Sequence, residues 1–253
     1  MLRITYVGHA TVLLEQDGTH LLTDPLLRGR VLHLRRSTRL SQDFTRQQLS
    51  AVLISHTHQD HFDLPSLERL RKDTSIIVPK GTGRRLSQRG FRNIRECSAG
   101  QEIHLGSLVI QATHAEHRKS RFARGPCQDC LGYLVRGTHN VYFAGDTDLF
   151  PGMAQIGEKN LDVALLPVWG WGPNLGPGHM DPYRAALALR LLIPRLAIPI
   201  HWGTLFPLGF DFIPSWAGFL SDPPHRFAWF AKRLAPEIEV SILQPGESKT
   251  VLS

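Results

Sequence analysis

Long apolar runs and cysteines are scarce in this chain of 253 residues. No stretch of about 18 apolar residues is present that could span a bilayer. The chain also lacks a P-loop, a dinucleotide-binding glycine fingerprint and the Gly-x-Ser-x-Gly elbow of serine hydrolases. We therefore expect neither a membrane span nor nucleotide chemistry, and no serine nucleophile is indicated.

Three cysteines are too few for a structural Cys₄ zinc site. Cys127 and Cys130 form a Cys-x-x-Cys pair, and the remaining cysteine is Cys97. The pair is compatible with a redox pair, part of a zinc site or two inert thiols, and the sequence favours the inert reading. A structural disulfide is not expected in a cytoplasmic protein.

Linkers, low-complexity tracts and repeats with a period of about 20–50 residues are also missing. With 42% hydrophobic residues, the chain can bury a substantial core. We expect one domain over residues 1–253. The alternating stretch 2–7 starts a strand at once and shows no secretory signal, so a cytoplasmic location is expected.

Four potential metal ligands stand within six residues directly after the apolar run 51–54. They are His56, His58, Asp60 and His61. Imidazole and carboxylate groups together suit zinc, manganese or iron. A buried core would not tolerate so many polar groups without partners. The spacing predicts a metal site at the end of a strand.

Further histidines and aspartates follow three later apolar runs. His114 ends the run 108–113, with His117 three residues later; Asp146 follows 141–144, and His201 follows 196–200. Each ligand candidate would stand at the carboxyl end of a strand. The spacing does not choose between His114 and His117, and His114 is the preferred match.

The pattern His-x-His-x-Asp-His after a hydrophobic strand resembles the first motif of the metallo-β-lactamase superfamily. The resemblance extends over nearly the whole chain and implies an α/β fold, a four-layer αββα sandwich. It also implies a dinuclear metal site, with zinc the expected ion and manganese or iron as alternatives. The implied ligands are His56, His58 and His114 for one ion, Asp60, His61 and His201 for the second, and Asp146 for both.

The start of the chain resembles one branch of this superfamily, which contains L-ascorbate 6-phosphate lactonase and N-acyl phosphatidylethanolamine phospholipase D. The matching segments are 6–11, 23–25 and 178–182. The resemblance implies that His9 and Asp24 orient ligands, although 8–10 is also compatible with a plain hairpin turn. It makes His179 a candidate for substrate contact.

The ligand set predicts a hydrolase whose nucleophile is a metal-bound hydroxide. Asp60 or a metal-bound water would return a proton to the leaving group, and His179 is the second candidate for a catalytic role. The expected substrate is a phosphodiester or a phosphorylated lactone. The alternatives are a ribonuclease, a lactamase, a thioesterase, or a sensor that binds a ligand at the metals without turnover.

The net charge of +7 indicates an anionic partner. Arginines gather in two segments, which are 28–46 and 118–124. Arginine binds phosphate in a bidentate manner, so a small phosphorylated substrate is expected and nucleic acid is the second choice. An ordinary solvated basic surface explains the charge equally well. A homo-oligomer stays open.

Aromatic residues gather after two of the expected strands, in the segments 169–171 and 206–219. They either cover the core or line a partly aromatic pocket, and the core is preferred.

The pattern of apolar residues and turn signals predicts mixed α/β structure. Asp17-Gly18 is expected as a hairpin turn, and Asp63 and Pro65 as a helix start. Strands are expected at 2–7, 10–15, 20–23, 51–54, 75–78, 107–113, 131–135, 141–144, 162–167, 196–200 and 238–243. Helices are expected at 64–72, 82–89 and 183–193.

Overall fold

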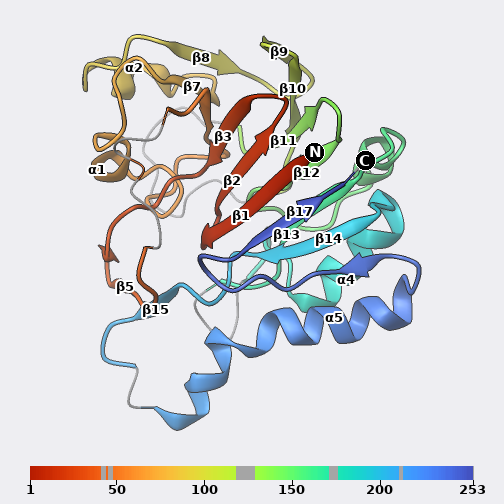
Figure 1. Cartoon of the computed structure of the whole chain (residues 1–253). Coiled ribbons are helices and arrows are strands. Elements are labelled where there is room, and N and C mark those ends of the chain that lie inside the picture. Colours follow the sequence, from red (N-terminus) through yellow and green to blue (C-terminus); the bar gives the residue numbers. More distant parts are fainter. Residues whose placement is uncertain (41–43, 45–47, 118–128, 171–175, 211–212, 253) are drawn as a thin grey trace.

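Two large β-sheets and a small third one form the framework of the protein. The computed structural model of the chain describes residues 1–252 apart from 41–43, 45–47, 118–128, 171–175 and 211–212. Within these residues each large sheet has seven strands. Figure 1 shows the first sheet mainly in red to orange and the second mainly in green to cyan.

The first sheet combines an antiparallel half with a parallel half. Its strands in spatial order are β17 (Ser248–Val251), β1 (Leu2–Gly8), β2 (Thr11–Gln16), β3 (Thr19–Thr23), β6 (Ala51–Leu53), β7 (Ser75–Pro79) and β8 (Ile94–Cys97). The pairs from β3 to β8 are parallel. Carboxyl ends of neighbouring parallel strands lie at the same edge, which places the loop after β6 there.

The second sheet has the same mixed character. Its order is β16 (Glu239–Val240), β14 (Leu196–Ile200), β13 (Val163–Pro167), β12 (Val141–Phe143), β11 (Leu131–Arg136), β10 (Leu108–His114) and β9 (Glu102–Leu105). Strands β12, β13 and β14 pair in parallel. The loops after β12 and β14 therefore leave the sheet at one edge.

The main core lies between the two sheets. Along β1, Leu2, Ile4 and Tyr6 are fully buried and join the same cluster as Tyr133 and Phe143 of the second sheet. Alternate residues of a strand point to opposite faces, so one strand serves two layers. The first sheet is therefore covered on both faces.

Helices cover the outer faces. Val52 and Ile54 face a second cluster that includes Leu67 of α1 (Leu64–Leu67) and Leu86 of α2 (Gly83–Ser87). On the other sheet, α3 (Met153–Gly157), α4 (Pro182–Leu192) and α5 (Asp222–Leu234) contribute buried residues to the main core. The order helix, sheet, sheet, helix is the expected αββα sandwich, which is confirmed.

A third, three-stranded sheet closes one end of the sandwich. It contains β4 (Arg30–Val31), β5 (Leu34–Arg36) and β15 (Leu205–Pro207), and β5 pairs with β15 antiparallel. β5 and β15 lie side by side at the left of Figure 1. This sheet joins the segment after β3 to the segment after β14.

Most expected strands agree with the structure to within two residues. The turn Asp17-Gly18 joins β2 to β3 with positive φ at both residues, +51° and +71°, as hairpins of this type require. The expected strand 238–243 is shorter, since only Glu239–Val240 pair with β14. The short strands β4, β5, β8, β9, β15 and β17 were not expected.

The sequence predicted the starts of the helices better than their lengths. Asp63 accepts from the backbone N–H of Ser66, and Asp181 accepts from that of Arg184, with proline in the first turn of each helix. The expected helix 64–72 ends at Leu67. Helix α5 was not expected, because Pro223 and Pro224 suggest a loop. Prolines are tolerated there because N–H groups of a first turn make no intrahelical bond.

Close packing between α3 and α4 depends on a glycine. A Cβ placed on Gly157 would lie only 2.3 Å from the carbonyl oxygen of Leu191. Gly157→Ala is therefore expected to destabilise the fold by about 1–3 kcal/mol through overpacking. Chemical denaturation measures this difference. Gly29→Ala is the control, since nothing lies within 4 Å of its added Cβ; equal stability of both variants would contradict the assigned contact.

Candidate metal centre

Loops from both large sheets meet at one end of the sandwich. The loop after β6 brings His56, His58, Asp60 and His61, and the segments after β10, β12 and β14 bring His117, Asp146 and His201. The hairpin between β1 and β2 adds His9. Seven of these side chains, all except Asp146, form two groups, each with its ligand atoms within 4.8 Å of one another.

The first group consists of three imidazoles, those of His56, His58 and His117. Nδ1 of His58 lies 2.9 Å from Nε2 of His56 and 3.1 Å from Nε2 of His117. His56 and His117 are buried and His58 is half-buried. Three ring nitrogens thus converge on one small volume.

Hydrogen bonds behind the first group fix which nitrogens face inward. His117 donates from Nδ1 to the carbonyl oxygen of Gly178, at 2.7 Å. The Ser55 hydroxyl donates to Asp24 over 2.5 Å, so His56 donates from Nδ1 to Ser55 Oγ at 2.9 Å. The Nε2 atoms of His56 and His117 therefore present lone pairs. A proton on Nδ1 of His58 can form a good hydrogen bond with only one of these two lone pairs, whereas a metal cation can accept a lone pair from all three rings.

The second group consists of His9, Asp60, His61 and His201. His61 donates from Nδ1 to Asp24 Oδ2 at 2.7 Å, and His201 donates from Nδ1 to the carbonyl oxygen of Trp169. Their Nε2 atoms face each other at 3.2 Å. With both Nδ1 atoms protonated, neutral rings here would hold two lone pairs against each other.

Asp146 lies between the two groups. Its Oδ2 is 3.3 Å from Nε2 of His61 and 3.8 Å from Nε2 of His179. Its Oδ1 is buried and has no hydrogen-bond donor among the described residues, although Nε2 of His201 lies 3.2 Å away. That nitrogen presents a lone pair, so it does not satisfy the carboxylate.

The pKa values of the histidines indicate that this buried site favours a positive charge beside its carboxylates. Burial, together with the charge of nearby His201, lowers the pKa of His9 to about 3. Burial and the charge of His117 lower the pKa of His58 to about 4. Burial opposes the charged form of His61 too, but the carboxylates of Asp146 and Asp60 raise its pKa well above the ordinary value. A proton on His61 thus places a positive charge beside the two carboxylates, as a metal ion at this site would.

Asp60 and Asp146 are themselves held as carboxylates. Burial favours their neutral forms, but the surrounding histidines keep the pKa of both well below the ordinary value. Carboxylates, mostly neutral imidazoles and an orphaned carboxylate oxygen together fit divalent ions. The donor set is therefore suitable for the expected metal site.

Of the two alternatives His114 and His117, only His117 reaches a group of potential ligands. His114, at the end of β10, is 58% exposed and lies 3.4 Å from Glu116, outside both groups. His117 is 7% exposed and reaches His56 and His58. The structure therefore favours the alternative His117 over the preferred His114 as a ligand: the chain turns after β10, and the side chain three residues later points inward.

The groups expected to orient ligands also reach the site. Asp24 is fully buried and binds His61 and Ser55. His9 contacts Asp60, with Nε2 and Oδ2 3.0 Å apart. His179 is 29% exposed and belongs to a set with His117 and Asp146. The hairpin interpretation of 8–10 holds as well, because His9 occupies that turn.

Sequence reasoning missed Ser55, Thr204 and the carbonyl of Trp169. Ser55 precedes the first histidine of the motif directly, and that position is the only signal the sequence carries for it. Thr204 accepts from the backbone N–H of His9 at 2.7 Å. A contact between residues almost two hundred positions apart leaves no local pattern.

Arg28 and Arg36 of the basic segment 28–46 both bind groups of the protein itself. Arg28 forms a bidentate pair with Asp63, and Arg36 is buried. Arg118, Lys119, Arg121, Arg124 and Cys127 lie outside the described residues. The aromatic rings form a chain of contacts: Trp169 stacks on Phe219, Phe219 meets Trp216 edge to face, and Trp216 stacks on Phe210. Only Phe210 is exposed among these four.

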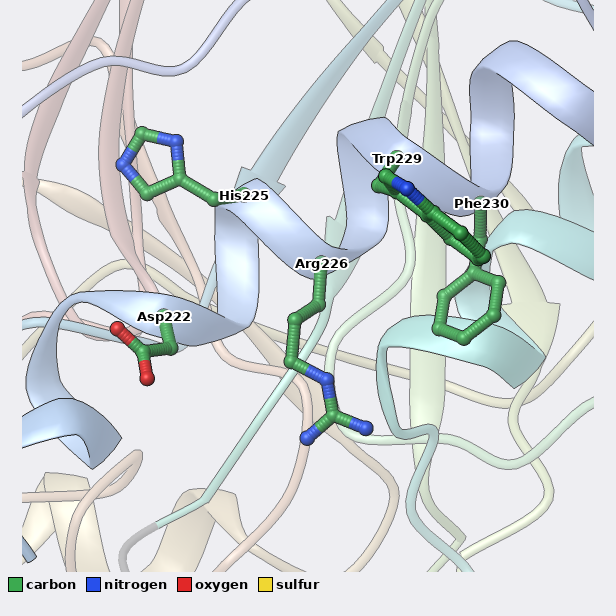
Figure 2. A pocket seen from close by; sticks show the side chains of 5 residues that line it. All are labelled: Asp222, His225, Arg226, Trp229 and Phe230. Carbon is green, nitrogen blue, oxygen red and sulfur yellow. The ribbon is translucent and has the colours of Figure 1, made fainter.

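A pocket on α5 is separate from this site. Figure 2 shows its lining, with Arg226 extending away from the helix and Trp229 beside Phe230. Trp229 is 52% exposed, and Arg233 lies over its ring at 3.5 Å. None of the lining residues belongs to the metal groups. No helix in the described residues is long and apolar enough to cross a membrane.

Comparison with known proteins supports the same fold and chemistry. Residues 19–202 match the family model described as the beta-lactamase superfamily domain, which is more than half of the chain. The chain belongs to the metallo-β-lactamase superfamily. The predicted class of metal-dependent hydrolase is confirmed at this level. The lactonase and phospholipase branch stays a prediction.

Relatives and a solved structure carry names of the same kind. A UPF0173 metal-dependent hydrolase of Methanopyrus kandleri is 32% identical over 98% of this chain and 99% of its own length. One of Deinococcus radiodurans is 34% identical over 98% and 99%. The structure of Igni18, a metallo hydrolase from Ignicoccus hospitalis, covers 100% of this chain and 99% of its own, with 27% identity and a TM-score of 0.75.

The choice between His117 and His114 as a metal ligand can be tested directly. His117→Ala is expected to weaken metal binding strongly, because it removes one of three converging nitrogens, whereas His114→Ala should bind as the wild type does. Metal content after dialysis, together with zinc titration, measures the difference. Loss of metal in the His114 variant alone would reverse the assignment.

Proposed function

We propose that the protein is a dinuclear metal-dependent hydrolase. His56, His58 and His117 would hold one ion, and Asp60, His61 and His201 the second, with Asp146 shared between them. The observation that carries the proposal is the convergence of inward lone pairs beside two carboxylates. Zinc is the expected ion, and manganese and iron accept the same ligands.

A bound pair of such ions supplies a hydroxide nucleophile near neutral pH and polarises the bond under attack. The chain itself orients the ligands. Asp24 accepts a hydrogen bond from the ring of His61. It also accepts one from the Ser55 hydroxyl, which in turn accepts a hydrogen bond from the ring of His56. His9 fixes Asp60 through the contact of Nε2 with Oδ2. Such outer contacts commonly contribute about 10–100-fold in metal affinity.

Proton transfer to the leaving group falls to His179 in this scheme. It is more exposed than His117 or Asp146, and its Nε2 faces Asp146. Its Nδ1 has no hydrogen-bond partner among the described residues. The sequence instead suggested Asp60 for this proton transfer, but the neighbouring His61 and His9 favour its carboxylate form. We assign Asp60 to metal binding and His179 to proton transfer.

For the substrate, we propose a phosphodiester or a phosphorylated lactone in a cytoplasmic, single-domain enzyme. The net charge of +7 and the resemblance of 6–11 and 178–182 to the lactonase and phospholipase branch support this class. A ribonuclease, lactamase or thioesterase uses the same nucleophile. Oligonucleotide cleavage that weakens steeply with salt would favour the ribonuclease. A non-catalytic sensor would bind ligand without turnover.

Hydrolysis of bis(p-nitrophenyl) phosphate tests the proposal. The chelated protein should be inactive, and added zinc or manganese should restore turnover. Asp146→Asn should abolish that turnover, because one neutral amide cannot replace a carboxylate between two ions. Folding of the variant is checked by circular dichroism. Two bound ions without turnover on phosphodiester, lactone or thioester substrates would leave the sensor as the function.

A second test addresses His179. The variant His179→Ala should still bind two ions, while kcat falls by about 10²–10⁴-fold, the usual contribution of a general acid. His225→Ala, an exposed histidine on α5, is the matched control and should leave kcat unchanged. An unchanged kcat in His179→Ala on a substrate with a poor leaving group would exclude the assigned role.

A further inference from the structure

Arg36 is a buried cation without a carboxylate partner in the described part of the chain. Its residue is 8% exposed at the end of β5. Nη1 donates to the carbonyl oxygen of Leu26 at 2.9 Å, and Nη2 donates to that of Val7 at 2.6 Å. Burying a charge without an opposite charge is costly. We therefore ask which backbone conformation the hydrogen bonds of this guanidinium stabilise.

The carbonyl of Val7 leads into the turn that carries His9. Gly8 has φ +125° and His9 has φ +58°, and positive φ is costly for a residue with a side chain. A Cβ on Gly8 would lie 2.9 Å from Nη2 of Arg36 and 2.7 Å from Oγ1 of Thr204. The guanidinium and the threonine hydroxyl therefore lie directly against this turn.

Thr204 fixes the same turn from the other side. Its Oγ1 accepts from the backbone N–H of His9 at 2.7 Å and donates to the carbonyl oxygen of Trp202 at 3.1 Å. The backbone N–H of His201 donates to the carbonyl oxygen of His9 at 2.8 Å. His201 itself has φ +64°. Two strained histidines are thus held to each other by their backbones.

The small third sheet supplies the rigid base. Arg36 stands opposite Leu205 in the pairing of β5 with β15, and the backbone N–H of Ser37 donates to the carbonyl oxygen of Thr204 at 2.8 Å. Arg36 and Thr204 therefore belong to adjacent strand ends, as β5 and β15 in Figure 1 indicate. Their contacts converge on the His9 turn.

The far end of His9 belongs to the second group of ligands. Its Nε2 lies 3.0 Å from Asp60 Oδ2, and its ring centroid is 4.0 Å from that of His201. Any shift of the turn therefore moves the contacts of Asp60 and His201. No hydrogen bond from Arg36 or Thr204 to His56, His58 or His117 exists among the described residues.

We propose that Arg36 and Thr204 are positioning residues for the second ion alone. They set the backbone of His9, and through it the positions of Asp60 and His201. This inference rests on the proposed dinuclear function, and it predicts that the two ions respond differently to substitutions in this clamp.

Zinc titration of the chelated full-length protein, with calorimetry and metal analysis, tests the proposal. Arg36→Met and Thr204→Val should weaken binding of the second ion by about 10–100-fold, while the first ion binds as before. Thr204→Ser keeps the hydroxyl and should restore the affinity. Adding Arg36→Met to His201→Ala should cause no further loss, because both act on one subsite.

Ser37→Ala is the matched control. Its hydroxyl donates to the carbonyl oxygens of Gly203 and Thr204, so the change affects the same strand ends without touching the His9 turn. Thermal unfolding of each metal-free variant shows how far stability has changed. Ser37→Ala should retain both ions even where its melting temperature falls.

Three outcomes would overturn the inference. Unchanged affinity for the second ion in folded Thr204→Val, with two ions and turnover in the wild type, would remove the clamp and leave the proposed function standing. Equal weakening of both ions in Arg36→Met and Thr204→Val would show a merely structural role. A wild type that binds no second ion would remove the proposed function and this inference together.

Discussion

The organisation of this protein depends on a need for positive charge at the meeting point of its two large sheets. Asp60 and Asp146 are held as carboxylates in a buried place, and inward lone pairs of several imidazoles surround them. Like charges and lone pairs repel strongly where water is excluded. Only protons or metal ions relieve this arrangement, and the strand ends must hold it in place.

The fold meets that requirement by placing the polar groups at the edge of two apolar sheets. The central strands β6, β13 and β14 are buried along their whole length, so hydrophobic burial supports the framework while polar groups gather at its edge. Parallel pairing brings successive carboxyl ends to one place. The second row of contacts, from Asp24, Ser55, Gly178 and Trp169, then chooses which ring nitrogen points inward.

Much of this arrangement was predictable from local sequence. Apolar runs identified the central strands, and the cluster His56 to His61 identified the site, since both signals lie within a few residues. The choice between His114 and His117 depended on how the chain turns after β10, which no local pattern encodes. Helix α5 was hidden by its two prolines, and the clamp of Arg36 involves contacts between distant segments. Long-range geometry decided the choice of ligand and the clamp, whereas the start of α5 depends on the tolerance of prolines in a first helical turn.

Three residues of the site, His9, Asp24 and His201, adopt left-handed backbone conformations, with φ of +58°, +31° and +64°. Glycine would take up each of these conformations with less strain, but it would remove the side chain that the site uses. Backbone strain at these three positions thus lowers the stability of the fold, while the side chains needed at the site are kept. Ligands that bind only the folded state repay part of that loss by mass action. We therefore expect the metal-loaded protein to unfold at a higher temperature than the metal-free polypeptide.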